Sequence, residues 1–141
     1  MDLRQALHQV DLFRALPESA LDDLMQSGTT FKLPAGRAIV EQGAPGGGFQ
    51  LIRTGSAVVS IDGFERVTLG EGQYFGEMSL IDNAPRSATV LAGPDGVTTF
   101  ALSPLNFSAL MDRHPQVARA LLPVLTARIR AAESAHRPAG Q

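Results

Sequence analysis

The stretch YFGEMSLIDNAPRSATV, residues 74–90, decides how this chain is interpreted. It is mostly apolar, yet it carries an acid, Glu77, and a base, Arg86, on either side of a turn. Gly76 allows close backbone approach, and the four residues after it suit one or two helical turns whose free N–H groups attract an anion. Arg86 follows Pro85, which stiffens the turn, and its planar fork binds two phosphate oxygens at once.

Two further groups in this stretch suit a sugar phosphate. Ser87 adds a hydroxyl beside Arg86, and Glu77 is an acceptor for a sugar hydroxyl. We therefore expect the segment to bind a molecule with one phosphate and at least one hydroxyl. The alternative is an ordinary ion pair between Glu77 and Arg86 that holds a loop together without any ligand.

Short runs separated by glycine and proline surround this stretch. They predict strands at residues 29–33, 37–41, 49–54, 56–61, 65–69, 87–92 and 97–102. Asp62-Gly63 is the strongest hairpin signal, and Gly93-Pro94-Asp95-Gly96 is a further expected turn. The GAPGGG run at residues 43–48 lacks the Lys-Ser/Thr of a nucleotide triphosphatase and is typical of a flexible hairpin loop. Such regular spacing predicts a mainly β fold, an antiparallel jelly-roll β-barrel.

Helical patterns flank the β region on both sides. Near the start of the chain the apolar spacing is helical, and Gly28 is the expected stop. After the strands, Ser103 is expected to cap a helix that begins at Pro104, and Pro115 opens a second helix. Pro123 inside that helix predicts a bend and a hinge. The tail from residue 136 is expected to fray.

The length of 141 residues predicts a single domain. Its expected parts are an N-terminal helical part at 1–28, a β-roll at 29–102 that contains the stretch 74–90, and C-terminal helices at 103–135. Neither a signal peptide nor an apolar run of roughly 20 residues is present, so a cytoplasmic location is expected.

Composition argues against several classes of site. The chain has no cysteine, which excludes disulfides, thiolate zinc sites and cysteine nucleophiles. A metal-dependent enzyme with a small β-barrel needs several histidines inside the barrel, whereas His8, His114 and His136 fall outside the expected strands. No Ser-His-acid set is expected for the same reason. We expect a binding module with no catalytic activity, no metal and no cofactor.

The segment FGEMSLIDNAPRSATV resembles the phosphate-binding cassette of the cyclic nucleotide-binding domain family. This family includes the bacterial catabolite activator protein, the regulatory subunits of cyclic-AMP-dependent kinase and cyclic-nucleotide-gated channels. The resemblance covers most of the chain. It implies an eight-stranded β-roll with the cassette inside it, preceded by a helical stretch and followed by two helices.

The resemblance also implies roles for the cassette residues. Gly76, Met78 and Ala88 would offer backbone contacts, Glu77 would bind the ribose 2′-hydroxyl, and the cyclic phosphate would be held by two side chains. The complete set of expected ligand-binding residues is Phe75, Gly76, Glu77, Met78, Ser79, Arg86, Ser87, Ala88 and Arg128, of which Arg86 and Ser87 would hold the phosphate.

The ligand implied by the resemblance is cyclic AMP, with cyclic GMP as the alternative. In the family, a threonine directly after the cassette arginine often accompanies a preference for cyclic GMP. This chain has Ser87 there, which retains a hydroxyl. The last helix would move over the nucleotide as a lid, and its Arg128 would either stack on a purine face or extend to solvent.

A regulatory sensor that signals through this helix is the expected function. One alternative is the sensor fragment of a cyclic-AMP-responsive transcription regulator, in which a helix-turn-helix domain follows the last helix. Another is a docking module of the same fold that has lost its ligand. The net charge of −2 gives no reason to expect direct nucleic-acid binding by this chain. The sequence does not name the effector domain or partner protein.

Overall fold

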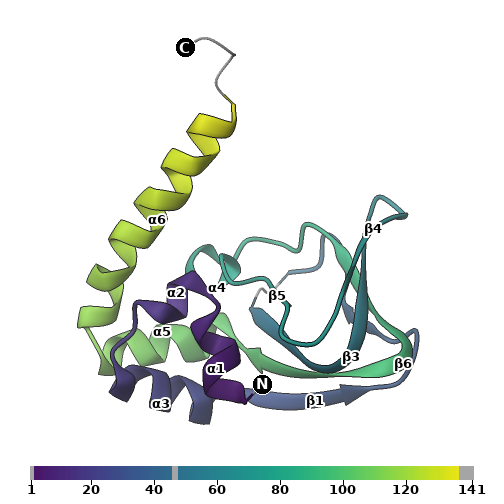
Figure 1. The fold of residues 1–141 in the computed structure, drawn as a ribbon, viewed down its shortest axis with the longest axis horizontal. Coiled ribbons are helices and arrows are strands. Elements are labelled where there is room, and N and C mark those ends of the chain that lie inside the picture. Colours follow the sequence, from purple (N-terminus) through teal and green to yellow (C-terminus); the bar gives the residue numbers. More distant parts are fainter. Residues whose placement is uncertain (1, 46–47, 137–141) are drawn as a thin grey trace.

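The computed structural model describes residues 2–45 and 48–136. Its strands form one antiparallel sheet in the order β1-β6-β3-β4, with β2 also paired to β6 and β5 to β3. The strands are β1 (Thr29–Leu33), β2 (Ala38–Val40), β3 (Phe49–Ile61), β4 (Phe64–Leu69), β5 (Tyr74–Phe75) and β6 (Thr89–Leu102). The sheet is open, as in a jelly roll, and the predicted class of antiparallel β structure with flanking helices is confirmed (Figure 1).

Local signals located the first strand and one hairpin correctly. β1 has the predicted bounds, Thr29–Leu33. Asp62 and Gly63 connect β3 to β4 with φ values of 53° and 82°, so both residues adopt the left-handed backbone that this tight turn requires. The Asp-Gly hairpin is therefore confirmed.

The turn predicted at residues 93–96 is wrong. β6 runs through it, so the two predicted strands on either side are one strand, and β3 likewise joins the segments predicted at 49–54 and 56–61. The pairing of β3 with β6 is irregular at this point, and a Cβ on Gly55 would lie only 2.2 Å from the carbonyl oxygen of Gly96. The glycines thus allow two strands to approach closely. The eight strands implied by the resemblance appear as six within the described residues.

The helices gather at one end of the sheet, except for the last, which extends away from it (Figure 1). They are α1 (Leu3–His8), α2 (Asp11–Arg14), α3 (Glu18–Ser27), α4 (Ser79–Asp82), α5 (Pro104–Arg113) and α6 (Gln116–Ala135). Gly28 ends α3, as predicted. The Ser103 hydroxyl accepts a hydrogen bond from the N–H of Asn106 at 3.0 Å, which confirms the predicted cap of α5.

Within residues 2–45 and 48–136, no helix has both the length and the apolar character that a membrane crossing would need.

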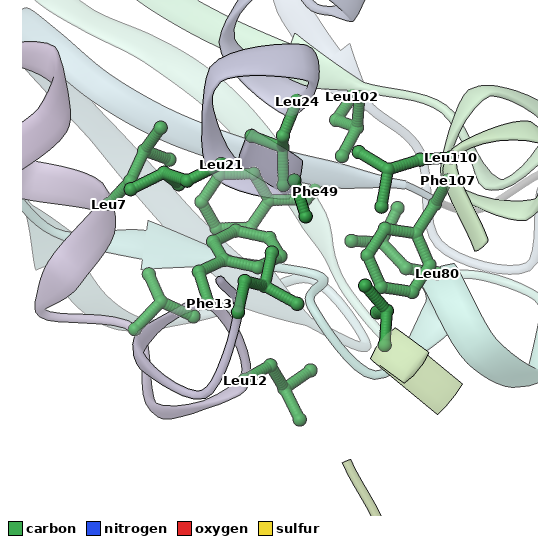
Figure 2. Packing of buried hydrophobic residues seen from close by; sticks show 14 of the residues in the cluster. Leu7, Leu12, Phe13, Leu21, Leu24, Phe49, Leu80, Leu102, Phe107 and Leu110 are labelled. Carbon is green, nitrogen blue, oxygen red and sulfur yellow. The ribbon is translucent and has the colours of Figure 1, made fainter. Parts of the chain in front are cut away.

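A cluster of aromatic rings joins the helices to the sheet. Phe13 of α2 meets Phe49 of β3 edge to face, with ring centroids 4.8 Å apart, and Phe107 of α5 lies 6.3 Å from Phe13. Figure 2 shows leucines from several helices packed around these rings. Leu80 of α4 is 3% exposed within the same core, so the segment 74–90 is anchored by a buried side chain.

The buried apolar residues of the last helix lie in its first half. Val117 and Leu121 are buried, whereas Ile129 is 59% exposed. The helix continues through Pro123, and the predicted bend and hinge there stay predictions. Two predicted segments lie partly outside the described residues: the tail, at residues 137–141, and the glycine-rich loop, at residues 46–47.

Candidate ligand-binding site

The segment 74–90 borders a cavity of about 430 Å³. This volume falls within the range of roughly 300–1,000 Å³ that is usual for small-molecule sites. The cavity is lined by Val40, Val59, Ile61, Phe75, Gly76, Glu77, Met78, Ser79, Asp82, Ala84, Pro85, Arg86, Ser87, Ala88 and Val90. One wall is therefore apolar and comes from β2, β3 and β6, while the polar groups come from the segment between β5 and β6.

A glycine and a serine give this segment its shape. Gly76 has a φ of +83°, and a Cβ there would lie 2.2 Å from the carbonyl oxygen of Gly48. The Ser79 hydroxyl accepts a hydrogen bond from the N–H of Gly48 at 2.6 Å and donates to the carbonyl of Gly76 at 2.7 Å. The helical turns predicted after Gly76 are present, with α4 beginning at Ser79. The Ser79 hydroxyl is thus engaged with the backbone.

Arg86 also lines the cavity, and its backbone is fixed. Its carbonyl accepts from the N–H of Gly43 at 2.8 Å, and its N–H donates to the carbonyl of Ala44 at 3.2 Å. The guanidinium lies 5.8 Å from the centre of the Phe75 ring, close enough for a cation–π contact. Burial lowers the pKa of Arg86 below its ordinary value, although an arginine stays charged in proteins.

No counter-charge balances Arg86 within the part of the chain that the structure describes. Its guanidinium has no carboxylate within ion-pair distance and donates no hydrogen bond to any described residue. A partly buried cation without a partner is costly, because desolvation penalises the charged form. Such a group beside a cavity is suited to receive an anion.

Glu77 is paired with a different arginine. Its Oε1 accepts a hydrogen bond from Nη1 of Arg128 at 3.0 Å. Arg128 also donates from Nε to Oδ2 of Asp11 at 2.9 Å and from Nη2 to Oδ1 of the same residue. The alternative of a Glu77–Arg86 ion pair is therefore wrong, since the two side chains that line the cavity do not neutralise each other.

Arg128 itself does not border the cavity. The hydrogen bonds that it donates to Asp11, followed by the one to Glu77, raise the pKa of Arg128 further above its ordinary value. The alternative of a side chain that extends to solvent does not describe this structure, in which the Arg128 side chain is 27% exposed and paired with two carboxylates. Contact between Arg128 and a nucleotide stays a prediction.

The structure gathers most of the predicted site residues around one cavity. These are Phe75, Gly76, Glu77, Met78, Ser79, Arg86, Ser87 and Ala88; their contacts with a ligand stay predictions. Sequence reasoning missed the apolar wall of Val40, Val59, Ile61 and Val90, although β-branched residues on neighbouring strands were the available signal. Asp11 was also missed, because nothing local connects it to a residue 117 positions away.

The arrangement offers three complementary surfaces. Arg86 presents positive charge, and the hydroxyl of Ser87 lies next to it in the chain. Glu77 presents a carboxylate whose second oxygen, Oε2, accepts no hydrogen bond from any described residue. The valine-lined wall suits a flat apolar group. A small molecule with an anionic group, a hydroxyl and an aromatic ring matches all three surfaces.

Comparison with known proteins identifies relatives that are similar in sequence. A cyclic nucleotide-gated potassium channel of Mesorhizobium japonicum is 35% identical over 114 residues, which cover 81% of this chain and 31% of the channel. A cAMP-dependent protein kinase regulatory subunit of Emericella nidulans is 35% identical over 88 residues, 61% of this chain and 21% of that protein. The chain therefore spans between 21% and 31% of the length of these two relatives.

Solved structures share the fold along most of the chain. The N-terminal domain of a transcriptional regulator from Streptomyces coelicolor has a TM-score of 0.81 and 28% identity, and the match covers 94% of this chain and 98% of that one. The regulatory domain of Toxoplasma gondii PKA, crystallised with cAMP, has a TM-score of 0.68 and 31% identity over 77% of this chain and 42% of that one. The family model described as the cyclic nucleotide-binding domain matches residues 30–114. The chain belongs to the cyclic nucleotide-binding domain family.

Proposed function

We propose that this domain binds a cyclic nucleoside monophosphate, with cyclic AMP favoured over cyclic GMP, as a regulatory sensor without catalytic activity of its own. The observation that carries the proposal is the uncompensated guanidinium of Arg86 at the cavity. A cyclic phosphate carries one negative charge and supplies the missing partner. Because the arginine is already partly desolvated, less of the binding free energy is spent on stripping water from it.

The remaining surfaces of the cavity fit the rest of such a ligand. With the phosphate on Arg86 and Ser87, the ribose 2′-hydroxyl donates to Glu77. The base then lies against the apolar wall that includes Val40 and Val59. Backbone groups of the segment 76–88 complete the phosphate site.

The preference for cyclic AMP is supported by two observations. Serine rather than threonine follows the cassette arginine, at Ser87. The Toxoplasma gondii regulatory domain, which was crystallised with cAMP, is 31% identical to this chain. Titration with both nucleotides tests the preference, and a tenfold higher affinity for cyclic GMP would overturn it.

Calorimetry on wild type and Arg86→Ala tests the binding itself. Removing one partner of a partly buried charge pair costs about 2–5 kcal/mol, so cyclic AMP affinity is expected to fall by roughly 30-fold to several thousand-fold. Arg66→Ala is the matched control, since Arg66 lies on exposed β4 and does not border the cavity. If wild type binds neither nucleotide at millimolar concentration, the chain is instead a docking module without a ligand.

We further propose that binding is signalled by movement of α6. The first half of this helix is packed on the core through Val117 and Leu121, whereas Ile129 beyond Pro123 is exposed. A ligand shifts the helix only by binding its two positions with different affinity. Amide hydrogen exchange after Pro123 is expected to slow on nucleotide saturation; unchanged protection would show that the helix is a fixed element.

A second candidate is the sensor part of a transcription regulator, acting in the cytoplasm as the sequence leads us to expect. It is favoured by the match to the Streptomyces coelicolor domain, which covers 98% of that chain. The test is the gene itself: an in-frame extension after Gln141 that encodes a helix-turn-helix domain supports this candidate, and a stop codon there excludes it.

A further inference from the structure

A single guanidinium connects three distant segments behind the candidate site. Arg128 of α6 contacts Asp11 at the start of α2 and Glu77 in the cassette, which are 117 and 51 positions away along the chain. Asp11 receives two of the hydrogen bonds and Glu77 receives one. The two-point contact with Asp11 fixes the plane of the guanidinium, because the fork of an arginine matches a carboxylate.

The geometry leaves one oxygen of Glu77 available to a ligand. Arg128 occupies Oε1, whereas Oε2 has no partner among residues 2–45 and 48–136. Glu77 borders the cavity and Arg128 does not, so the arginine holds the carboxylate from behind. The Glu77 side chain is 18% exposed. Without Arg128, this carboxylate would have to be ordered when the ligand binds, which would cost binding free energy.

We propose that Asp11 is a positioning residue that sets the selectivity of the site for a sugar with a free 2′-hydroxyl. Asp11 orients Arg128, Arg128 orients Glu77, and Glu77 accepts the hydroxyl. Asp11 itself touches no ligand. This inference rests on the proposed binding of a cyclic nucleotide and adds to it a residue of α2 that lies outside the cassette.

The order of the three residues has a thermodynamic consequence. A hydroxyl bound to Glu77 favours the conformation in which Arg128 is held, and linkage requires that a held Arg128 favours the hydroxyl equally. A ligand without the hydroxyl gains nothing from the alignment of Glu77. The effect of Asp11 must therefore depend on the sugar and be small for a 2′-deoxy ligand.

The test compares cyclic AMP with 2′-deoxy cyclic AMP on wild type, Asp11→Asn and Arg128→Gln. Replacing one residue of a hydrogen-bond network such as this one is expected to change ligand affinity by about three- to tenfold. Asp11→Asn is expected to weaken cyclic AMP binding by about that factor and 2′-deoxy binding by less than about twofold. The double variant Asp11→Asn/Arg128→Gln should bind cyclic AMP no more weakly than Arg128→Gln alone, because Asp11 acts through Arg128. Asp22→Asn is the control, since Asp22 of α3 pairs with Arg4 and touches no cassette residue.

Asparagine at position 11 can still accept the hydrogen bond from the N–H of Leu12, and Arg128→Gln, which leaves α2 unchanged, provides an independent measurement. Unchanged selectivity in both variants, or an equal loss for both ligands, would overturn the role of Asp11 and leave the proposed function standing. Absence of binding by wild type would overturn both.

Discussion

Replacing Gly76 by alanine tests how closely the cassette backbone must approach its surroundings. Gly76 has a φ of +83°, and an added Cβ would lie 2.2 Å from the carbonyl oxygen of Gly48 and 2.5 Å from Nη1 of Arg86. The first contact involves backbone, which does not move aside cheaply. The second involves the group that is proposed to hold the phosphate.

Two separate costs add up at this position. A side chain at positive φ costs about 1–3 kcal/mol, and overpacking adds about 1–3 kcal/mol. We expect Gly76→Ala to lower the free energy of unfolding by about 2–6 kcal/mol. Because Arg86 must shift, cyclic AMP affinity is expected to fall by at least about tenfold, or 1.4 kcal/mol.

Gly72→Ala separates the two costs. Gly72 has nearly the same backbone conformation, with a φ of +85°, but nothing lies within 4 Å of its added Cβ. Urea unfolding and calorimetry on both variants give the contact energy as the difference. If both variants lose equal stability and bind cyclic AMP equally well, close approach at Gly76 is not what shapes the site.

Two further predictions concern stability. Phe13→Ala is expected to cost about 3–5 kcal/mol in urea unfolding because Phe13 is fully buried at the junction of helices and sheet, whereas Phe64→Ala, at 69% exposure, should stay within about 0.5 kcal/mol of wild type. The hydrogen bonds from Arg113 hold the pKa of Asp23 below its ordinary value. The ionised carboxylate therefore stabilises the fold at neutral pH. This contribution is lost as the pH falls below about 4, the ordinary pKa of an aspartate, towards the lowered pKa. Asp23→Asn should therefore show a shallower loss of stability in acid than wild type, and Arg113→Gln should reproduce that change; an acid titration of stability identical to wild type would contradict it.

The elements that local chemistry determines could be predicted from the sequence. Ser103 before Pro104 has only one common use, as the start of a helix, and the structure confirms it. Asp62-Gly63 similarly required a tight hairpin, because both residues tolerate positive φ. The predicted cassette residues line one cavity, since they lie close together in the chain, and their contacts with a ligand stay predictions.

Features that depend on distant contacts could not be predicted in this way. Glycine and proline at residues 93–96 indicate an irregular backbone, but whether the chain reverses or continues depends on what lies opposite. Gly55 and Ser56 of β3 lie opposite, and a Cβ at Gly93 would be 2.0 Å from the Ser56 hydroxyl, so the strand continues past a close contact. The partner of Glu77 could not be predicted for the same reason. Arg86 is the nearest base to Glu77 in the sequence, whereas in the fold Glu77 pairs with Arg128.

Because Glu77 pairs with Arg128 and not with Arg86, one cavity can present both an acid and a base to a ligand. If Glu77 and Arg86 paired with each other, a phosphate would have to break their ion pair before binding. Instead Arg128 neutralises the acid that would repel a phosphate, and Arg86, which attracts it, stays unpaired among the described residues. The unliganded protein bears the cost of that unpaired charge, so Arg86→Ala is expected to lose binding without losing stability in urea. A large loss of stability in that variant would mean that Arg86 supports the fold, and the anion site would lose its physical basis.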